Sequence, residues 1–221
     1  LAPFERVRKY IDRYGDEGIG EFIVSMTTRA SDLTMLYLLC KEAGLIECWE
    51  GKRVCRVSIV PLFETMEDLE SSVAIMKGFL SAPITRDTLA YLGRRDEPSA
   101  MLPQSVMVGY SDSNKDCGIW ASQWTVYNCQ KRLLAMSEEI GVPIRFFHGR
   151  GGTVGRGSGP MHRFIEALPQ SGLDHGFRIT EQGEVIAQKY NSVENAVASF
   201  EQLAAGVTCA RMLRTHETII E

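Results

Sequence analysis

The feature that most restricts the fold is a repeated alternation of short apolar runs with segments of helical periodicity. Runs of this length, bounded by polar turn residues, are typical of buried strands. They occupy residues 22–26, 57–63, 106–110, 144–147 and 177–180. Continuous apolar strands that alternate with helices indicate a parallel sheet covered on both faces, so the sequence predicts an α/β fold.

The segments between the strands carry the predicted helices. Ser31 and Asp32 are expected to cap the first of them, because short polar side chains satisfy free amide groups at a helix start. Further helices are predicted over residues 66–80, 118–140 and 193–207, and a helical excursion is expected within residues 81–104. Apolar spacing in the longest helix assigns Trp120 and Trp124 to packing.

Composition excludes several classes of protein. The 221 residues are 44% hydrophobic and carry a net charge of −4, which fits one soluble domain and argues against nucleic acid as a partner. No apolar run reaches the roughly 18 residues that a membrane helix needs. The six cysteines form no Cys-x-x-Cys pair, so we expect no zinc site, and buried free thiols in a reducing cytoplasm.

Residues 147–160 form the most unusual segment of the chain. They read Phe-His-Gly-Arg-Gly-Gly-Thr-Val-Gly-Arg-Gly-Ser-Gly-Pro, with six glycines, two arginines and no acid. Glycine lets backbone amides approach a ligand, and arginine matches a carboxylate or phosphate, so the segment predicts an anion-binding loop. It lacks the lysine of a Walker loop and the spacing of a dinucleotide fingerprint. The alternative is a flexible surface turn with solvated arginines.

This loop resembles the glycine-rich catalytic loop of phosphoenolpyruvate carboxylases. Three further stretches resemble the same family in the same order: Val-Pro-Leu-Phe-Glu-Thr, Val-Gly-Tyr-Ser-Asp-Ser-Asn-Lys-Asp and Arg-Ile-Thr-Glu-Gln-Gly-Glu. The resemblance runs from about residue 21 to about residue 215. It implies that residues 1–221 are a single domain. That domain would be a partial TIM-type (β/α) barrel of about five strand–helix units, within the catalytic domain of a longer enzyme.

The resemblance also implies a reaction. The family's enzymes are lyases that carboxylate phosphoenolpyruvate with bicarbonate, giving oxaloacetate and phosphate through carboxyphosphate and a metal-stabilised pyruvate enolate. This is carbon dioxide fixation that supplies the tricarboxylic acid cycle. The family further implies a cytoplasmic homo-oligomer, a tetramer in full length, with an acidic allosteric inhibitor such as aspartate or malate. The family's Thr-Ala-His-Pro motif is absent from this chain, so we expect the isolated chain to be inactive.

Two carboxylates are the predicted metal ligands. Glu64 and Asp112 follow different strands, and side chains at the carboxyl ends of parallel strands meet at one edge of a sheet. Two carboxylates with water suit Mg²⁺ or Mn²⁺, and the resemblance implies that these two residues hold it. The alternatives are a helix cap or exposed loop acid for Glu64 and a turn residue for Asp112.

The resemblance assigns the remaining site residues. Arg150 is expected to clamp the phosphate of phosphoenolpyruvate beside Gly151 and Gly152, and His148 to stabilise carboxyphosphate or handle its proton. His148 and Arg150 are two residues apart in an extended segment, so their side chains should point the same way. Lys115 is expected near bicarbonate or the reacting anion, and its alternative is a solvated lysine at a helix start.

The far limb of the loop completes the set. Arg156 matches an arginine that serves catalysis and, in some members, inhibitor binding. Ser158 replaces a frequent glycine and would be strained if its φ were positive. Gln182 and Glu184 belong to a matching segment but receive no role. Two other functions stay open: a non-catalytic anion-binding fragment, and another metal-dependent barrel enzyme that uses phosphoenolpyruvate.

Overall fold

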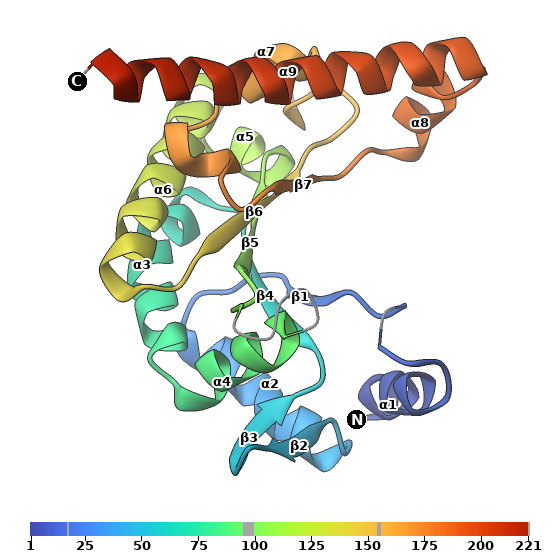
Figure 1. Ribbon diagram of the computed structural model, residues 1–221, viewed down its shortest axis with the longest axis vertical. Coiled ribbons are helices and arrows are strands. Elements are labelled where there is room, and N and C mark those ends of the chain that lie inside the picture. The colour runs from blue at the N-terminus through green and yellow to red at the C-terminus, as the bar shows by residue number, and fades with distance from the viewer. Residues whose placement is uncertain (17, 95–99, 154–155, 221) are drawn as a thin grey trace.

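The computed structural model describes residues 1–16, 18–94, 100–153 and 156–220. In these residues, helices surround a parallel sheet (Figure 1). The strands are β1 (Glu21–Val24), β2 (Ile46–Trp49), β3 (Lys52–Cys55), β4 (Ser58–Phe63), β5 (Gln104–Gly109), β6 (Ile144–Gly149) and β7 (Phe177–Ile179). The helices are α1 (Ala2–Tyr14), α2 (Ala30–Glu42), α3 (Met66–Leu80), α4 (Pro83–Gly93), α5 (Ser111–Cys117), α6 (Ile119–Ile140), α7 (Met161–Glu166), η2 (Gln170–Leu173), α8 (Gly183–Lys189) and α9 (Val193–Ile220).

The main sheet follows the chain from one edge to the other. Its strand order is β1-β4-β5-β6-β7, and every neighbouring pair is parallel. Each pair is joined by at least one helix, as parallel strands require. The prediction of an α/β fold with a five-stranded parallel sheet is therefore confirmed.

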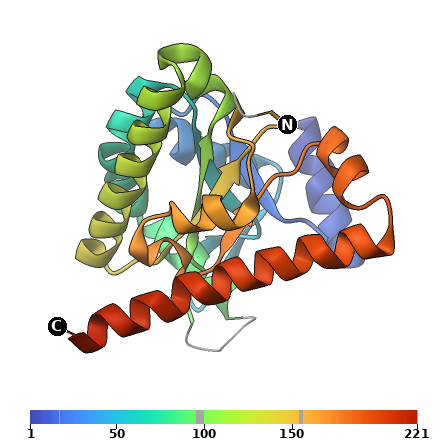
Figure 2. The same cartoon turned by 90° about the horizontal axis from the view of Figure 1, so that it is seen from above.

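The principal core lies between this sheet and helices α2, α3 and α6. Both views show α3 and α6 side by side along the sheet (Figures 1 and 2). Phe63, Val106 and Phe146 point from three strands into this layer and are fully buried there with Phe79 and Leu133. Burial of side chains this large stabilises the layer by about 1.5–3 kcal/mol each.

The second face of the sheet is less well covered. Strand β4 is buried along its whole length, but β6 alternates buried and half-buried residues, and Ile23 on β1 is 37% exposed. The prediction of a sheet covered on both faces therefore holds for the centre of the sheet and is wrong for its edges. The half-buried face carries a pocket at each end of the strands.

Local signals placed the strands of the main sheet and the longer helices that follow them, and missed several shorter elements. Helix α3 has the predicted bounds, and α4 lies within the predicted helical excursion, of which residues 95–99 are outside the described residues. The β2–β3 hairpin was not predicted, since each of its strands is only four residues long and neither alternates regularly between polar and apolar residues. Helix α8 was also missed. The predicted cap of α2 is confirmed in part. The N-cap is Arg29 and not Ser31 or Asp32, but Asp32 in the first turn accepts hydrogen bonds from the backbone amides of Thr28 and Arg29.

Two predictions about burial were wrong. Trp120 and Trp124 are 86% and 67% exposed on α6, so they do not pack into the described core. All six cysteines are free, as predicted, but Cys48 and Cys209 are exposed. In the described residues, no helix combines the length and the apolar character needed to cross a membrane.

Candidate active site

A pocket of about 190 Å³ opens at the carboxyl ends of the sheet strands. Segments that follow β4, β5, β6 and β7 all contribute to its wall. The lining residues are Leu62, Glu64, Met107, Gly109, Ser111, Asp112, Gly149, Arg150, Gly151, Arg156, Thr180 and Gln182. The structure thus brings together both predicted metal ligands and both loop arginines, which are far apart in the sequence.

The two carboxylates interact electrostatically. Glu64 is the first residue after β4, and Asp112 lies in the first turn of α5, just after β5. Partial burial raises the pKa of Glu64, and the negative charge of Asp112 raises it further. Glu64 is not a helix cap, because Thr65 caps α3 through a reciprocal pair of hydrogen bonds with Asp68.

The position of Glu64 depends on two neighbours. The backbone amide of Met26 donates a hydrogen bond to its carboxylate, which lowers the pKa against the two effects that raise it. Met26 has a left-handed φ of 54°, which is uncommon for a residue with a side chain. At Gly109, an added Cβ would lie 3.2 Å from the Glu64 Cγ, so a small residue there lets the two strand ends approach.

Lys115 lies at the rim. Its Nζ is 2.9 Å from Oδ1 of Asp112, and both side chains are more than half exposed. Exposed pairs of this kind contribute at most about 1 kcal/mol, so the pair is easily exchanged for other partners. Lys115 does not line the pocket, but it neutralises one of the two carboxylates that do.

Arg150 is the buried centre of the glycine-rich loop. Its Nε is 2.5 Å from the carbonyl oxygen of Gly157, and its Nη2 is 3.2 Å from that of Gly159. The guanidinium also lies over the ring of Phe164, 4.2 Å from the centroid. Burial lowers the pKa of Arg150. In this conformation Arg150 therefore holds both limbs of the loop together while it lines the pocket.

The backbone of the loop folds back on itself. Thr153 accepts backbone hydrogen bonds from Arg156 and Ser158 through its carbonyl oxygen, both at 2.9 Å. The positive φ of the far limb falls at Gly157, at 81°, and not at Ser158, so the serine is not strained. Residues 154–155 of the loop lie outside the described residues.

His148 is on the other side of the sheet from the carboxylates. It is the penultimate residue of β6, not a residue past its end as predicted, and its side chain is fully buried. Its ring packs against Phe164, which Arg150 also covers, so the two side chains point the same way as predicted. Its Nδ1 is 3.1 Å from the hydroxyl of Tyr110, and burial lowers its pKa to about 3. His148 is therefore neutral at physiological pH and does not line the pocket.

Arg156 contrasts with Arg150. Its side chain is exposed and reaches the pocket over Gly151, where an added Cβ would lie 2.3 Å from the Arg156 Cβ. Glu184 covers Gly152 in the same way, with an oxygen 2.4 Å from the position of an added Cβ. Gly151 is thus required by close packing against the stem of Arg156, whereas at Gly152 the flexible end of Glu184 could move aside.

Comparison with known proteins shows the family of the chain. The family model described as "Phosphoenolpyruvate carboxylase" matches residues 1–220. The chain belongs to the phosphoenolpyruvate carboxylase family. A protein of that name from Methylorubrum extorquens is 46% identical over 207 residues, which cover 94% of this chain and 22% of that protein. The namesakes from Mycobacterium avium and Thermosynechococcus vestitus are 42% and 40% identical, over 92% and 100% of this chain and 21% of each relative.

The chain spans about a fifth of the length of these phosphoenolpyruvate carboxylases. The remaining four fifths of each relative have no counterpart in this chain. The activity of the whole protein is therefore a matter for proposal.

Sequence reasoning missed several residues of this carboxylase-family pocket. Thr180 lies on its wall, and the Thr180 hydroxyl is buried without a hydrogen-bond partner in the described residues. Gln182 lines the pocket from the start of α8, and Ser111 from the start of α5. Tyr110 is buried behind the pocket, where it contacts Gly157 and His148. The matching motifs contain all four residues, but nothing in a motif says which side chain faces the pocket.

The donor set of the pocket fits a hard divalent cation that keeps several waters. Glu64 and Asp112 supply carboxylate oxygens, and their mutual repulsion is what a cation would relieve. The described residues contain no group of three or more His, Cys, Asp or Glu side chains placed to hold a metal. A closed zinc site is therefore a poor fit, whereas Mg²⁺ or Mn²⁺ with two carboxylates and water is a good one.

Proposed function

We propose that this chain supplies part of the active site of an enzyme that carboxylates phosphoenolpyruvate with bicarbonate to oxaloacetate and phosphate. One observation carries the proposal. Two carboxylates and two arginines of the family's motifs line one pocket at the carboxyl ends of parallel strands. That edge is where α/β proteins of this kind place their chemistry.

The strand order supports the barrel that the sequence predicts. The strands of the main sheet lie side by side in chain order. Crossovers between parallel strands are right-handed as a rule, so a sheet of this order adds each new strand at the same edge, as a (β/α) barrel does. We propose that this sheet is part of a (β/α) barrel, which strands from the rest of a longer protein would close. The half-buried face of the sheet would then be the barrel interior, with the candidate pocket at its mouth.

The loop arginines would bind the phosphate of phosphoenolpyruvate. Arg156 is exposed at the pocket, so it can meet the phosphate without rearrangement. Arg150 would join it by exchanging the carbonyls of Gly157 and Gly159 for phosphate oxygens. Two guanidinium groups neutralise the charge that develops as the phosphate moves to bicarbonate to form carboxyphosphate.

The rim residues would act on the second substrate. Lys115 would leave Asp112 and bind bicarbonate, since its present ion pair is weak and exposed. Glu64 and Asp112 would hold Mg²⁺ or Mn²⁺. When bound, the cation supplies Lewis-acid stabilisation of the negative charge on the pyruvate enolate. The loop would exclude water from the pocket, so that the enolate reacts with carbon dioxide and is not protonated.

His148 would act indirectly in the conformation described. Its ring is enclosed by Phe164, Phe177 and Tyr110, so it reaches a ligand only if the loop or α7 moves. We propose that it positions Tyr110, against which Gly157 of the loop packs. A direct role in stabilising carboxyphosphate requires that movement.

Four further expectations complete the proposal. The family relationship favours an acidic inhibitor such as aspartate or malate at Arg156, a homo-oligomeric full-length enzyme, and a cytoplasmic location. The isolated chain would form no oxaloacetate, because it spans about a fifth of its relatives. The names of these relatives favour a carboxylase over other barrel enzymes that use phosphoenolpyruvate.

A calorimetric titration with Mn²⁺ tests the proposal. We expect the chain to bind one Mn²⁺ more tightly when phosphoenolpyruvate is present, and the Glu64→Gln/Asp112→Asn variant to lose this binding. The matched control is Glu67→Gln, which removes an exposed acid from the first turn of α3. Binding that survives in the double variant, or that the control also loses, would place the metal elsewhere.

A further inference from the structure

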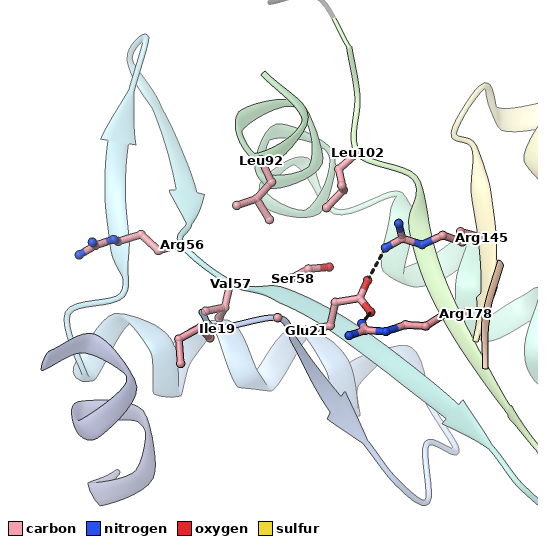
Figure 3. A pocket seen from close by; sticks show the side chains of 10 residues that line it. Ile19, Glu21, Arg56, Val57, Ser58, Leu92, Leu102, Arg145 and Arg178 are labelled. Carbon is pink, nitrogen blue, oxygen red and sulfur yellow. Dashed lines mark hydrogen bonds and ion pairs between the residues drawn. The ribbon is translucent and has the colours of Figure 1, made fainter. Parts of the chain in front are cut away.

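A second pocket, of about 250 Å³, lies at the amino ends of the same strands, opposite the candidate active site. Its residues come from the starts of β1, β4 and β6, from β7, and from the segments around α4 (Figure 3). The apolar side chains Ile19, Val57, Leu92 and Leu102 form one part of its wall. The other part is charged.

The charged part is built around one carboxylate and two arginines. Oε1 of Glu21 is 3.0 Å from Nη2 of Arg145, and its Oε2 is 2.8 Å from Nη1 of Arg178. Ser105 also hydrogen-bonds to Oε1 of Glu21. The Glu21 side chain is only 7% exposed, and both its oxygens are engaged. Its single negative charge is therefore shared between two guanidinium groups.

The arginines keep binding capacity beyond these bonds. Arg145 donates its hydrogen bonds to Glu21 and Ser105 through Nε and Nη2, and Arg178 donates to Glu21 through Nη1, so each guanidinium has further donors. Their side chains are 28% and 50% exposed. Figure 3 shows both groups at the same side of the pocket. Two positive charges that meet one negative charge leave an excess of about one positive charge in the pocket.

Arg56 does not change this balance. It lines the same pocket, but its guanidinium points away from Glu21 (Figure 3). Its Nη1 is 2.5 Å from Oδ1 of Asp12, and its Nε is 4.0 Å from Oε2 of Glu47. Its charge is thus balanced outside the pocket.

Ser58 provides an independent sign of a ligand. Its hydroxyl is buried in the pocket wall and has no hydrogen-bond partner in the described residues. In Figure 3 this hydroxyl points toward the side where Glu21 and Arg145 lie. A buried hydroxyl without a hydrogen-bond partner is unfavourable by about 1–3 kcal/mol, so a ligand that accepts a hydrogen bond from it would be stabilised there.

We propose that this pocket binds a small organic acid through its carboxylate or phosphate group. The oxyanion accepts hydrogen bonds from Arg145, Arg178 and Ser58, and the apolar wall contacts the body of the ligand. A volume of about 250 Å³ suits a compact acid. The site is separate from the pocket that would hold phosphoenolpyruvate, because no residue lines both.

Nuclear magnetic resonance of the ¹⁵N-labelled chain tests this site. Inorganic phosphate and sodium acetate are titrated separately at constant ionic strength, and the amides of Gly20, Val57 and Ser58 are followed. We expect saturable shifts of these amides. Shifts with phosphate alone identify a phosphate group as the ligand chemistry, and shifts with acetate identify a carboxylate. Because the shifts are read at named amides, anion binding at the glycine-rich loop is recorded separately.

Two variants and a control sharpen the test. Ser58→Ala removes a hydroxyl that has no partner in the described residues, so the fold is kept and the affinity falls about threefold to tenfold. Arg178→Gln weakens binding at least about tenfold, since it removes a charge-assisted donor. Arg163→Gln removes an exposed arginine of α7 and leaves the affinity unchanged. The proposal is overturned if neither probe gives saturable shifts or if Arg178→Gln binds like the wild type. An acidic side chain of another protein segment would then be the occupant to test.

Discussion

Arg150 shows how one residue can join the folding of a loop to the binding of an anion. Its guanidinium donates to the carbonyls of Gly157 and Gly159, and its charge rests on the ring of Phe164. These partners are neutral, so a phosphate oxygen would be a stronger acceptor than either carbonyl. An anion that binds Arg150 would therefore compete with the contacts that hold the two limbs of the loop together.

A matched pair of glycines tests the conformation of the loop. Gly157 has a φ of 81°, and an added Cβ would lie 2.8 Å from the Cβ of Tyr110, so Gly157→Ala is expected to lower the free energy of unfolding by about 1–3 kcal/mol. At Gly159 the nearest atom to an added Cβ is 3.8 Å away, so Gly159→Ala should change the free energy of unfolding by no more than about 0.5 kcal/mol. Urea unfolding of the two variants measures both values. Equal effects would contradict the described loop.

The buried His148 predicts a specific dependence of stability on pH. The folded chain holds the pKa of His148 at about 3, whereas the unfolded chain takes up this proton near pH 6.5. The contribution of His148 to stability is therefore complete above about pH 6.5 and is lost progressively as the pH falls toward 3. We expect the wild type to lose stability relative to His148→Phe as the pH falls from 8 to 5. The free energies of unfolding of both proteins, measured across this range, test this. If the difference between the two free energies stays constant over this range, the pKa of His148 is not lowered in the folded chain.

At the residue scale, the motifs predicted part of the pocket lining but not how each residue is used. Glu64, Asp112 and Arg156 reach it as expected. The burial of His148 and the engagement of Arg150 by the loop depend on where β6 ends and where Phe164 packs. Neither is a local property of the sequence.

At the scale of elements, helix α6 separates two kinds of apolar residue. Leu133 and Cys129 on one side are fully buried against the sheet and α3, and Trp120 and Trp124 on the other are exposed. Apolar periodicity predicted the helix and nearly its bounds, but it could not tell a core face from an exposed one, since both are apolar. The β2–β3 hairpin was missed because its turn requires a positive φ at Glu50 as well as at Gly51.

Substitutions on α6 distinguish its two faces. Leu133→Ala leaves a cavity in the core and is expected to lower the free energy of unfolding by about 2–5 kcal/mol. Trp124→Ser should change it by no more than about 0.5 kcal/mol, because its side chain is largely exposed. Thermal and urea unfolding give both numbers. A large effect of Trp124→Ser would mean that this face is covered in solution, for instance by another copy of the chain.

At the scale of the whole molecule, the six free cysteines differ in how deeply they are buried, so their reactivity tests the fold. Cys40, Cys55 and Cys129 are buried, Cys117 is half-buried, and Cys48 is exposed together with Cys209 on α9. Burial also raises the pKa of Cys129 to about 11, which suppresses its reactive thiolate. We expect a thiol reagent to modify the two exposed cysteines first and the three buried ones only after unfolding. Mass spectrometry of digested samples assigns each site, and early labelling of Cys129 would contradict the described core.

The strand order has a consequence for how quickly the chain folds. Every pairing in the main sheet joins residues that are about 30 to 45 positions apart, as in Glu21 with Ser58 and Leu62 with Met107. The chain must therefore close a long loop before the contacts of each strand pair can stabilise it. Among the described strands, only β2 and β3 pair as near neighbours in the sequence. A sheet built this way assembles slowly for its size. Until it is complete, the apolar strands β4 and β5 stay exposed to other chains, so chaperone supply and growth temperature should govern the yield of folded protein.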